Sequence, residues 1–149
     1  MYRMDEKDNR ILRELALNSR TSFRKIAGKL GMATTTVISR HNRLKKEGII
    51  KKHGISIDHE KTGYPIKVLI EIIAERGKLI DVEEIISKKP NVCAVYDITG
   101  ETDAAVIARF RTRKELNDFL KSTLSMEHVQ RTNTHLILNT VKEEMALPV

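Results

Sequence analysis

The sequence has few of the residues that hold together small secreted or metal-bound proteins. Of its 149 residues one is cysteine, three are proline and 4% are aromatic, with no tryptophan. A single cysteine, Cys93, cannot build a disulfide framework or a cysteine metal site within one chain, and we expect it to be a small buried residue. The longest apolar stretches, such as residues 68–73, are far shorter than a membrane span. These absences predict a soluble, cytoplasmic protein with a lean core.

Positive charge is concentrated in the first third of the chain. The net charge is +7, but residues 1–55 hold 14 Lys/Arg and 5 Asp/Glu, a net +9, whereas residues 56–149 hold 13 and 15, a net −2. Because phosphate contacts supply most non-specific nucleic-acid affinity, a nucleic acid is the natural partner of the basic third. A membrane surface is disfavoured, since this segment lacks the broad apolar face with aromatic anchors of an interfacial helix. The length and the asymmetry predict two small domains.

Three short helices are predicted in the basic third. Asp5 is a good N-cap for a first helix at about residues 5–17, because apolar residues follow it at helical spacing. Ser22 caps a second helix, which ends at Gly31. A third helix is expected over about residues 34–47. Three short helices joined through a tight glycine turn predict a helix-turn-helix unit.

The residues after the third helix have β-like composition. Residues 49–52 and 55–57 flank a His-Gly pair and predict a small wing or a connecting strand. We therefore expect a helix-turn-helix domain over residues 1–54, winged or not, followed by a linker or hinge at residues 55–65.

The third predicted helix and the residues after it carry groups that bind DNA. Arg40 or Arg43 could take guanine through two hydrogen bonds, and Asn42 could pair with adenine. Hydroxyls and lysines would contact phosphate. The alternative is a merely solvated charged helix, which the coincidence with a helix-turn-helix pattern disfavours. The candidate DNA-binding residues are Thr34, Thr35, Thr36, Ser39, Arg40, Asn42, Arg43, Lys46, Lys51 and Lys52.

The rest of the chain predicts an α+β domain over residues 66–149. Strands are expected at residues 66–74, 92–99, 103–111 and 129–141, and helices at residues 79–89 and 113–124. The order βαββαβ is that of the ferredoxin-like sandwich, in which one antiparallel sheet carries two helices on one face.

A polar turn, Gly100–Asp103, lies between two of these strands. It could be a plain hairpin turn whose glycine accepts positive φ. However, its carboxylates and hydroxyls could bind an ammonium group and its backbone N–H groups a carboxylate, so a zwitterionic amino acid fits. We expect Asp103 and Glu101 to matter most, and no metal or other cofactor. The candidate effector-binding residues are Tyr96, Thr99, Gly100, Glu101, Thr102, Asp103, Thr132 and Thr134.

Several motifs of the chain occur together in one known family. They are Ile26-Ala27-x-x-Leu30-Gly31, Thr36-Val37-x-x-Arg40-x-x-Arg43-Leu44, Gly63-Tyr64, Val95-Tyr96-x-x-Thr99-Gly100-Glu101-Thr102-Asp103 and Thr132-x-Thr134. In these motifs the chain resembles the Lrp/AsnC (feast/famine) regulators over essentially its whole length. The resemblance implies a DNA-binding regulator that binds an amino acid near the polar turn, where dimers meet, and a homodimer that assembles into tetramers or octamers.

Several positions depart from the family pattern, among them Ala33 and His41. Ala33 stands where a serine usually caps the recognition helix, so Thr34 could take over the cap and shift the helix start. His41 stands where an apolar residue is usual. It could be a pH-sensitive element or simply a satisfied residue at the edge of the core.

Two other functions are alternatives to a regulator. The outline also resembles sirohaem decarboxylases, but only His128 and His135 fall in the second domain near Arg131, and no catalytic set or phosphate loop is present. An architectural protein that coats DNA with little sequence preference is the other alternative.

Overall fold

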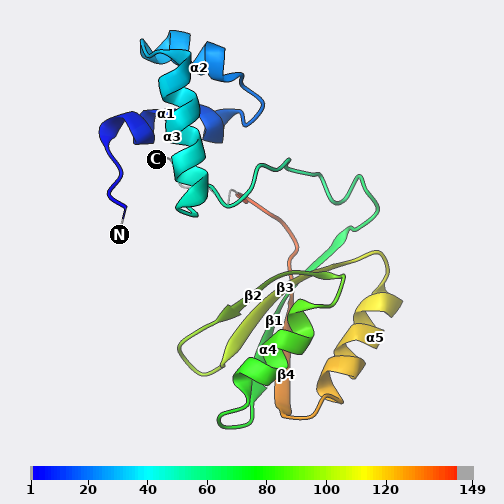
Figure 1. The fold of residues 1–149 in the computed structure, drawn as a ribbon. Helices are drawn as coiled ribbons and strands as arrows, with labels where there is room; N and C mark the ends of the chain where they lie inside the picture. The colour runs from blue at the N-terminus through cyan, green and yellow to red at the C-terminus, as the bar shows by residue number, and fades with distance from the viewer. Residues whose placement is uncertain (1, 144–149) are drawn as a thin grey trace. The chain divides into compact units, whose positions relative to one another are not determined.

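The computed structural model describes residues 2–143 and divides into two units (Figure 1). The first holds residues 2–56 together with Lys142 and Glu143, and the second holds Ile57–Val141. In the part of the chain that is described, no helix reaches the length and hydropathy that a membrane span requires.

The first unit consists of three helices, as predicted. They are α1 (Glu6–Leu17), α2 (Phe23–Leu30) and α3 (Thr34–Lys46). Asp5 and Asp8 form a capping box in which each carboxylate accepts a hydrogen bond from the other's backbone N–H, so two otherwise unpaired amides are satisfied. Ser22 caps α2, and Gly31 ends it with a left-handed φ of 64°, a conformation that costs glycine little.

The core of the first unit is small and aliphatic. Each helix contributes fully buried side chains, among them Ile11, Ile26 and Val37. Burial of a single aliphatic side chain of this size contributes about 1.5–3 kcal/mol. The packing fixes α3 against the other two helices, so the polar face of α3 is held outward.

The predicted range of α3 is confirmed, but Thr34 does not take over its cap. The helix begins at Thr34 with Ala33 in the N-cap position, and the carbonyl of Ala33 accepts the backbone N–H groups of Thr36 and Val37. The start is thus set by backbone bonding and by the burial of Val37, without a side-chain cap.

Residues 49–57 form neither a wing nor a strand. The backbone N–H groups of Ile49 and Ile50 both donate to the carbonyl of Leu44, which turns the chain back onto the end of α3. Residues 51–57 find no partner strand in the described chain, and an isolated extended segment does not make a stable sheet.

The second unit has the predicted βαββαβ order. Its elements are β1 (Ile66–Ala74), α4 (Leu79–Ser87), β2 (Val92–Asp97), β3 (Ala104–Phe110), α5 (Arg113–Leu124) and β4 (Val129–Leu136). The four strands form an antiparallel sheet in the order β2-β3-β1-β4. Figure 1 shows α4 and α5 in front of this sheet, and both helices contribute to one continuous core with it.

Strand β4 is shorter than the predicted range of 129–141. Its pairing with β1 ends at Val68 and Leu136, and one more bond joins the N–H of Ile137 to the carbonyl of Lys67. Since β1 begins at Ile66, no further partner is available to extend the ladder.

The two faces of the sheet differ in what covers them. The helix-covered face carries the buried Val68, Ile70 and Ile72 of β1. The opposite face, called the open face below, carries the residues that alternate with these, such as Glu71. The register places Tyr96, Ala105, Glu71 and Asn133 in one row across the open face.

The prediction that Cys93 is buried is wrong. Cys93 is exposed, because the β2–β3 register shifts between Val92 and Ala94. A bulge on an edge strand leaves its extra residue without a place in the packed face.

Candidate DNA interface and ligand pocket

The outward face of α3 carries most of the predicted DNA-binding residues. Val37, His41 and Leu44 are buried, whereas the residues between them lie on the surface. The exposed candidates are Thr35, Ser39, Asn42, Arg43, Lys46, Lys51 and Lys52, and those only partly exposed are Thr34, Thr36 and Arg40. One helix face therefore offers hydroxyl, amide and guanidinium groups together, with further lysines just beyond its end.

Arg40 is engaged inside the domain. Its Nη1 donates to Asp5 Oδ1 at 2.6 Å and to Asp8 Oδ1 at 2.8 Å, and its side chain is 19% exposed. Arg40 thus ties the middle of α3 to the first turn of α1. From the sequence alone Arg40 and Arg43 are equivalent candidates for reading a base, whereas in the structure Arg40 first holds the helices together.

Asp8 is the acceptor at the centre of this contact. Its carboxylate is fully buried, and burial raises its pKa. Hydrogen bonds from Tyr2, from the Asp5 backbone and from Arg40 outweigh that effect and lower the pKa to about 2. Asp8 is therefore a carboxylate at neutral pH, and its role as an ion-pair partner goes beyond the helix cap that the sequence indicates.

His41 is buried at the edge of the core, and each of its ring nitrogens lies within hydrogen-bond distance of another side chain. Its Nδ1 lies 3.2 Å from Asn42 Oδ1, and its Nε2 lies 3.1 Å from His53 Nε2. The ring also packs against Phe23 at a centroid distance of 4.7 Å. With Nδ1–H donating to Asn42, the Nε2 of His41 accepts the proton of His53. This agrees with the interpretation of His41 as a satisfied residue.

A pocket of about 390 Å³ opens beside the polar turn in the second unit. Its walls come from β1, β4 and the β2–β3 turn, and the turn residues Thr99, Glu101 and Thr102 are among those predicted. The full lining is Glu71, Ile73, Ile98, Thr99, Glu101, Thr102, Arg131 and Asn133.

The pocket is lined by charged residues of both signs. Glu71 Oε2 accepts hydrogen bonds from His135 Nε2 at 2.9 Å and from Asn133 Nδ2 at 3.1 Å, and these bonds lower the pKa of the Glu71 carboxyl. An ionised carboxylate thus lies in the same pocket as the guanidinium of Arg131. Ile73 and Ile98 add apolar surface. The arrangement suits a small molecule that carries an ammonium group, a carboxylate and an apolar part.

Of the two carboxylates that the sequence favours as effector ligands, Glu101 lines the pocket, whereas Asp103 lies outside the lining. Its Oδ2 accepts the backbone N–H of Ala74 at 2.9 Å, and its own backbone N–H donates to the carbonyl of Ile72. Asp103 therefore closes the end of the sheet, where it holds the turn in place.

Four further candidates do not line the pocket. Thr132 and Thr134 pair with the buried Ile72 and Ile70, so they lie on the helix-covered face of the sheet. Tyr96 lies on the open face but outside the pocket lining. Gly100 has a φ of 130°, so it shapes the turn through its backbone.

The pocket residues that the sequence reasoning missed are Glu71, Arg131 and Asn133. Glu71 is the one charged residue among residues 68–74 of β1, and a charge within an otherwise apolar run is an indication of function. Arg131 and Asn133 alternate with Thr132 and Thr134 along β4. The choice between the two sets depends on which face of the sheet the helices cover.

Comparison with known proteins bears on both units. Residues 4–45 match the AsnC-type helix-turn-helix domain, and residues 67–147 match the Lrp/AsnC ligand binding domain. This chain belongs to the Lrp/AsnC family. It is a transcription regulator with a helix-turn-helix domain for DNA and a domain for a ligand.

Relatives of this Lrp/AsnC regulator align over nearly its full length. An uncharacterised HTH-type transcriptional regulator of Pyrococcus furiosus is 42% identical over 144 residues, which is 97% of each chain. The HTH-type transcriptional regulator FL11 of Pyrococcus horikoshii is 34% identical over 146 residues, 98% of this chain and 97% of its own.

Solved structures of the family have the same fold. AsnC of E. coli superposes with a TM-score of 0.90 at 23% identity and covers 97% of this chain and 99% of its own. A transcriptional regulator of Neisseria meningitidis, solved as an L-Met complex, gives a TM-score of 0.89 at 23% identity, with 98% and 97% covered. Within residues 2–143, no group of three or more His, Cys, Asp or Glu side chains is arranged to hold a metal ion.

Proposed function

We propose that this Lrp/AsnC regulator binds DNA sequence-specifically and that an amino-acid effector modulates its DNA affinity or assembly. The observation that carries the proposal is the pocket beside the β2–β3 turn, in which Glu71 and Arg131 present opposite charges. A zwitterion carries a positive group that is complementary to Glu71 and a negative group that is complementary to Arg131, so it would bind in one orientation.

The binding mode follows from the chemistry of the lining. The ammonium group would bind Glu71, whose carboxylate is kept ionised, and the carboxylate would bind Arg131, whose planar guanidinium matches it. Thr99 and Thr102 would supply hydroxyl contacts, and the apolar surface of Ile73 and Ile98 would receive the side chain. That a regulator of the same fold is known with L-Met supports an amino acid as the ligand class.

The working unit is proposed to be a homodimer that assembles further into a tetramer or octamer. The open face of the sheet carries Leu69, Ile73 and Ile107, and neither α4 nor α5 covers it. A pocket that opens on this face would sense assembly, because a second subunit could complete its walls. A ligand that binds one assembly state better than another shifts the equilibrium between them.

Calorimetry with each standard amino acid tests the effector part of the proposal. One amino acid should bind the full-length chain, and both Glu71→Gln and Arg131→Gln should weaken binding at least tenfold, about 1.4 kcal/mol. Lys114→Gln on α5 removes one positive charge, as Arg131→Gln does, but lies on a different element, and it should bind like the wild type. Sedimentation with and without the ligand should show a change of assembly state.

If no amino acid binds, or if binding survives both pocket substitutions, the pocket is not the effector site. The second domain would then be an oligomerisation module only.

Footprinting tests the DNA part. The protected sites should be pseudo-palindromic, with half-sites about 10 bp apart or at a multiple of that spacing. Lys51→Ala should weaken binding to all sequences alike and lower the slope of binding against salt by about 1. Uniform protection of any DNA would indicate an architectural protein instead.

A further inference from the structure

Two arginines of α3 face the N-terminal segment, and they are held differently. Arg40 makes three short contacts with the carboxylates of Asp5 and Asp8 and is 19% exposed. Arg43 makes one long contact, 3.4 Å from Nη2 to Asp8 Oδ1, and is 44% exposed. Since a guanidinium has five N–H donors, the described bond leaves Arg43 able to bind a partner outside the domain.

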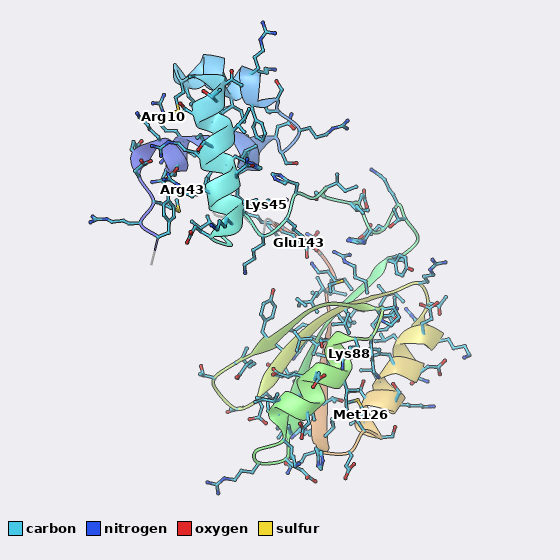
Figure 2. All side chains as sticks on the ribbon, in the orientation of Figure 1. Arg10, Arg43, Lys45, Lys88, Met126 and Glu143 are labelled. Carbon is cyan, nitrogen blue, oxygen red and sulfur yellow. The ribbon has the colours of Figure 1, made fainter. Side chains whose placement is uncertain are left out.

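Tyr2 supplies the surface on which Arg43 rests. The guanidinium carbon of Arg43 lies 4.6 Å from the centroid of the Tyr2 ring, within the range of a cation–π contact. Figure 2 shows Arg43 on α3 beside the segment that leads into α1. The contact therefore joins the start of the chain to the exposed face of α3.

The ring of Tyr2 is itself fixed. Its hydroxyl donates to Asp8 Oδ2, the second oxygen of the buried carboxylate that receives Arg40 and Arg43 on Oδ1. Because Asp8 is fully buried and bonded on both oxygens, it fixes the phenol, and the phenol in turn orients the guanidinium. Tyr2 thus contacts Arg43 through its ring face, and the Arg43 side chain stays 44% exposed.

We propose that Tyr2 is a positioning residue that orients Arg43 to read a base in the major groove. The inference rests on the proposed sequence-specific DNA binding and adds to it which arginine reads and what holds it. Arginine reads guanine by two parallel hydrogen bonds to O6 and N7, which require a defined plane of the guanidinium. A guanidinium already held in one plane loses less conformational freedom on binding, and pre-organisation of one long side chain is worth about three- to tenfold in affinity.

The first test needs no DNA. In the full-length chain, the Nε–Hε resonance of Arg43 should be displaced by the ring current of Tyr2. The displacement should be smaller in Tyr2→Phe, which keeps the ring but loses its bond to Asp8, and should disappear in Tyr2→Leu. An Arg43 resonance that is the same in wild type and Tyr2→Leu would overturn the inference, whatever the DNA experiments show.

The second test uses a DNA site selected from a random pool by the wild-type chain. Tyr2→Leu should weaken binding to that site about three- to tenfold and leave binding to random DNA nearly unchanged. Tyr2→Phe keeps the ring but loses its bond to Asp8, so its discrimination should lie between those of the wild type and Tyr2→Leu. A purely structural role for Tyr2 would lower the melting temperature without changing the ratio of specific to random binding. Tyr2→Met serves as a second apolar variant if Tyr2→Leu folds poorly.

A double-mutant cycle makes the assignment sharper. If Tyr2 acts through Arg43, then Tyr2→Leu should add nothing to the loss of discrimination caused by Arg43→Lys, which keeps the charge but loses the planar fork. Additive losses, or an unchanged ratio in Tyr2→Leu, would show that Tyr2 does not position Arg43. A wild-type chain that selects no sequence would contradict the proposed DNA function, while the resonance measurement would still decide whether Tyr2 orients Arg43.

Discussion

The carboxylate of Asp8 and the guanidinium of Arg40 meet at 2.8 Å, and this contact joins the first turn of α1 to the middle of α3. The two residues are 32 positions apart in the chain. A buried carboxylate with this many donors fixes the angle of the recognition helix, because any rotation of α3 would leave the charge of Asp8 without its partners.

The low pKa of Asp8 predicts an acid-sensitive fold. Its pKa falls from 3.8 to about 2 on folding, so the carboxylate contributes stability that is complete above about pH 4 and is lost as the pH falls through 2. The shift corresponds to about 2 kcal/mol. Urea unfolding at pH 7, 4 and 2.5 should show Asp8→Asn less stable than the wild type at pH 7, with the difference shrinking at pH 2.5. A difference independent of pH would contradict the prediction.

The two arginines of α3 should separate into different classes. Arg40→Ala should lower the free energy of unfolding by about 3 kcal/mol, because it leaves a buried charge short of its main partner. Arg43→Ala should leave stability nearly unchanged and reduce discrimination of the specific site by about 1–3 kcal/mol. Thermal unfolding and competition binding on both variants provide the comparison. Equal effects of the two substitutions in both assays would refute this division of roles.

His53 should stabilise the first domain through its bond to His41. His53→Ala removes the hydrogen-bond partner of the mostly buried Nε2 of His41, which should cost about 1–3 kcal/mol. His53→Gln keeps an N–H donor on the side chain and should recover part of that loss. The free energies of unfolding at neutral pH compare the three proteins. If His53→Ala is as stable as the wild type, the contact between the rings contributes nothing.

Asp103 should matter for the sheet more than for the ligand. Asp103→Ala removes the acceptor of the Ala74 backbone N–H, and a hydrogen bond to a charged group contributes about 1.5–3 kcal/mol. We therefore expect lower thermal stability with an unchanged ligand affinity per folded molecule. Calorimetry below the melting temperature can separate the loss of stability from a loss of ligand affinity. A specific loss of ligand binding in a stable Asp103→Ala protein would show that Asp103 belongs to the binding site.

Much of the fold could be predicted from local patterns. Asp5 and Ser22 cap helices through hydrogen bonds that span three residues, Gly31 ends one by a single backbone conformation, and β1 and α5 begin and end where the pattern predicts. These features depend on neighbours in the sequence, so the sequence alone determines them. The predicted wing failed because a strand also needs a partner, and local composition does not provide one.

The candidate sites depend on contacts between residues that are far apart in the sequence. On β4 the sequence shows that Thr132 and Thr134 share one face and Arg131 and Asn133 the other, but only the packing of the helices decides which face is open. The role of Asp103 also depends on the tertiary structure. Its place in the polar turn predicts a ligand contact, whereas in the structure its carboxylate accepts the backbone N–H of Ala74.

Within the first domain, the sequence by itself determined that α3 is basic and has a polar face. Only the tertiary structure decided that Asp8 takes up Arg40 and that Tyr2 underlies Arg43. The physical reason is that an ion pair or a ring contact depends on where two side chains meet in space, and residues 30 or 40 positions apart meet only after the core between their helices has formed.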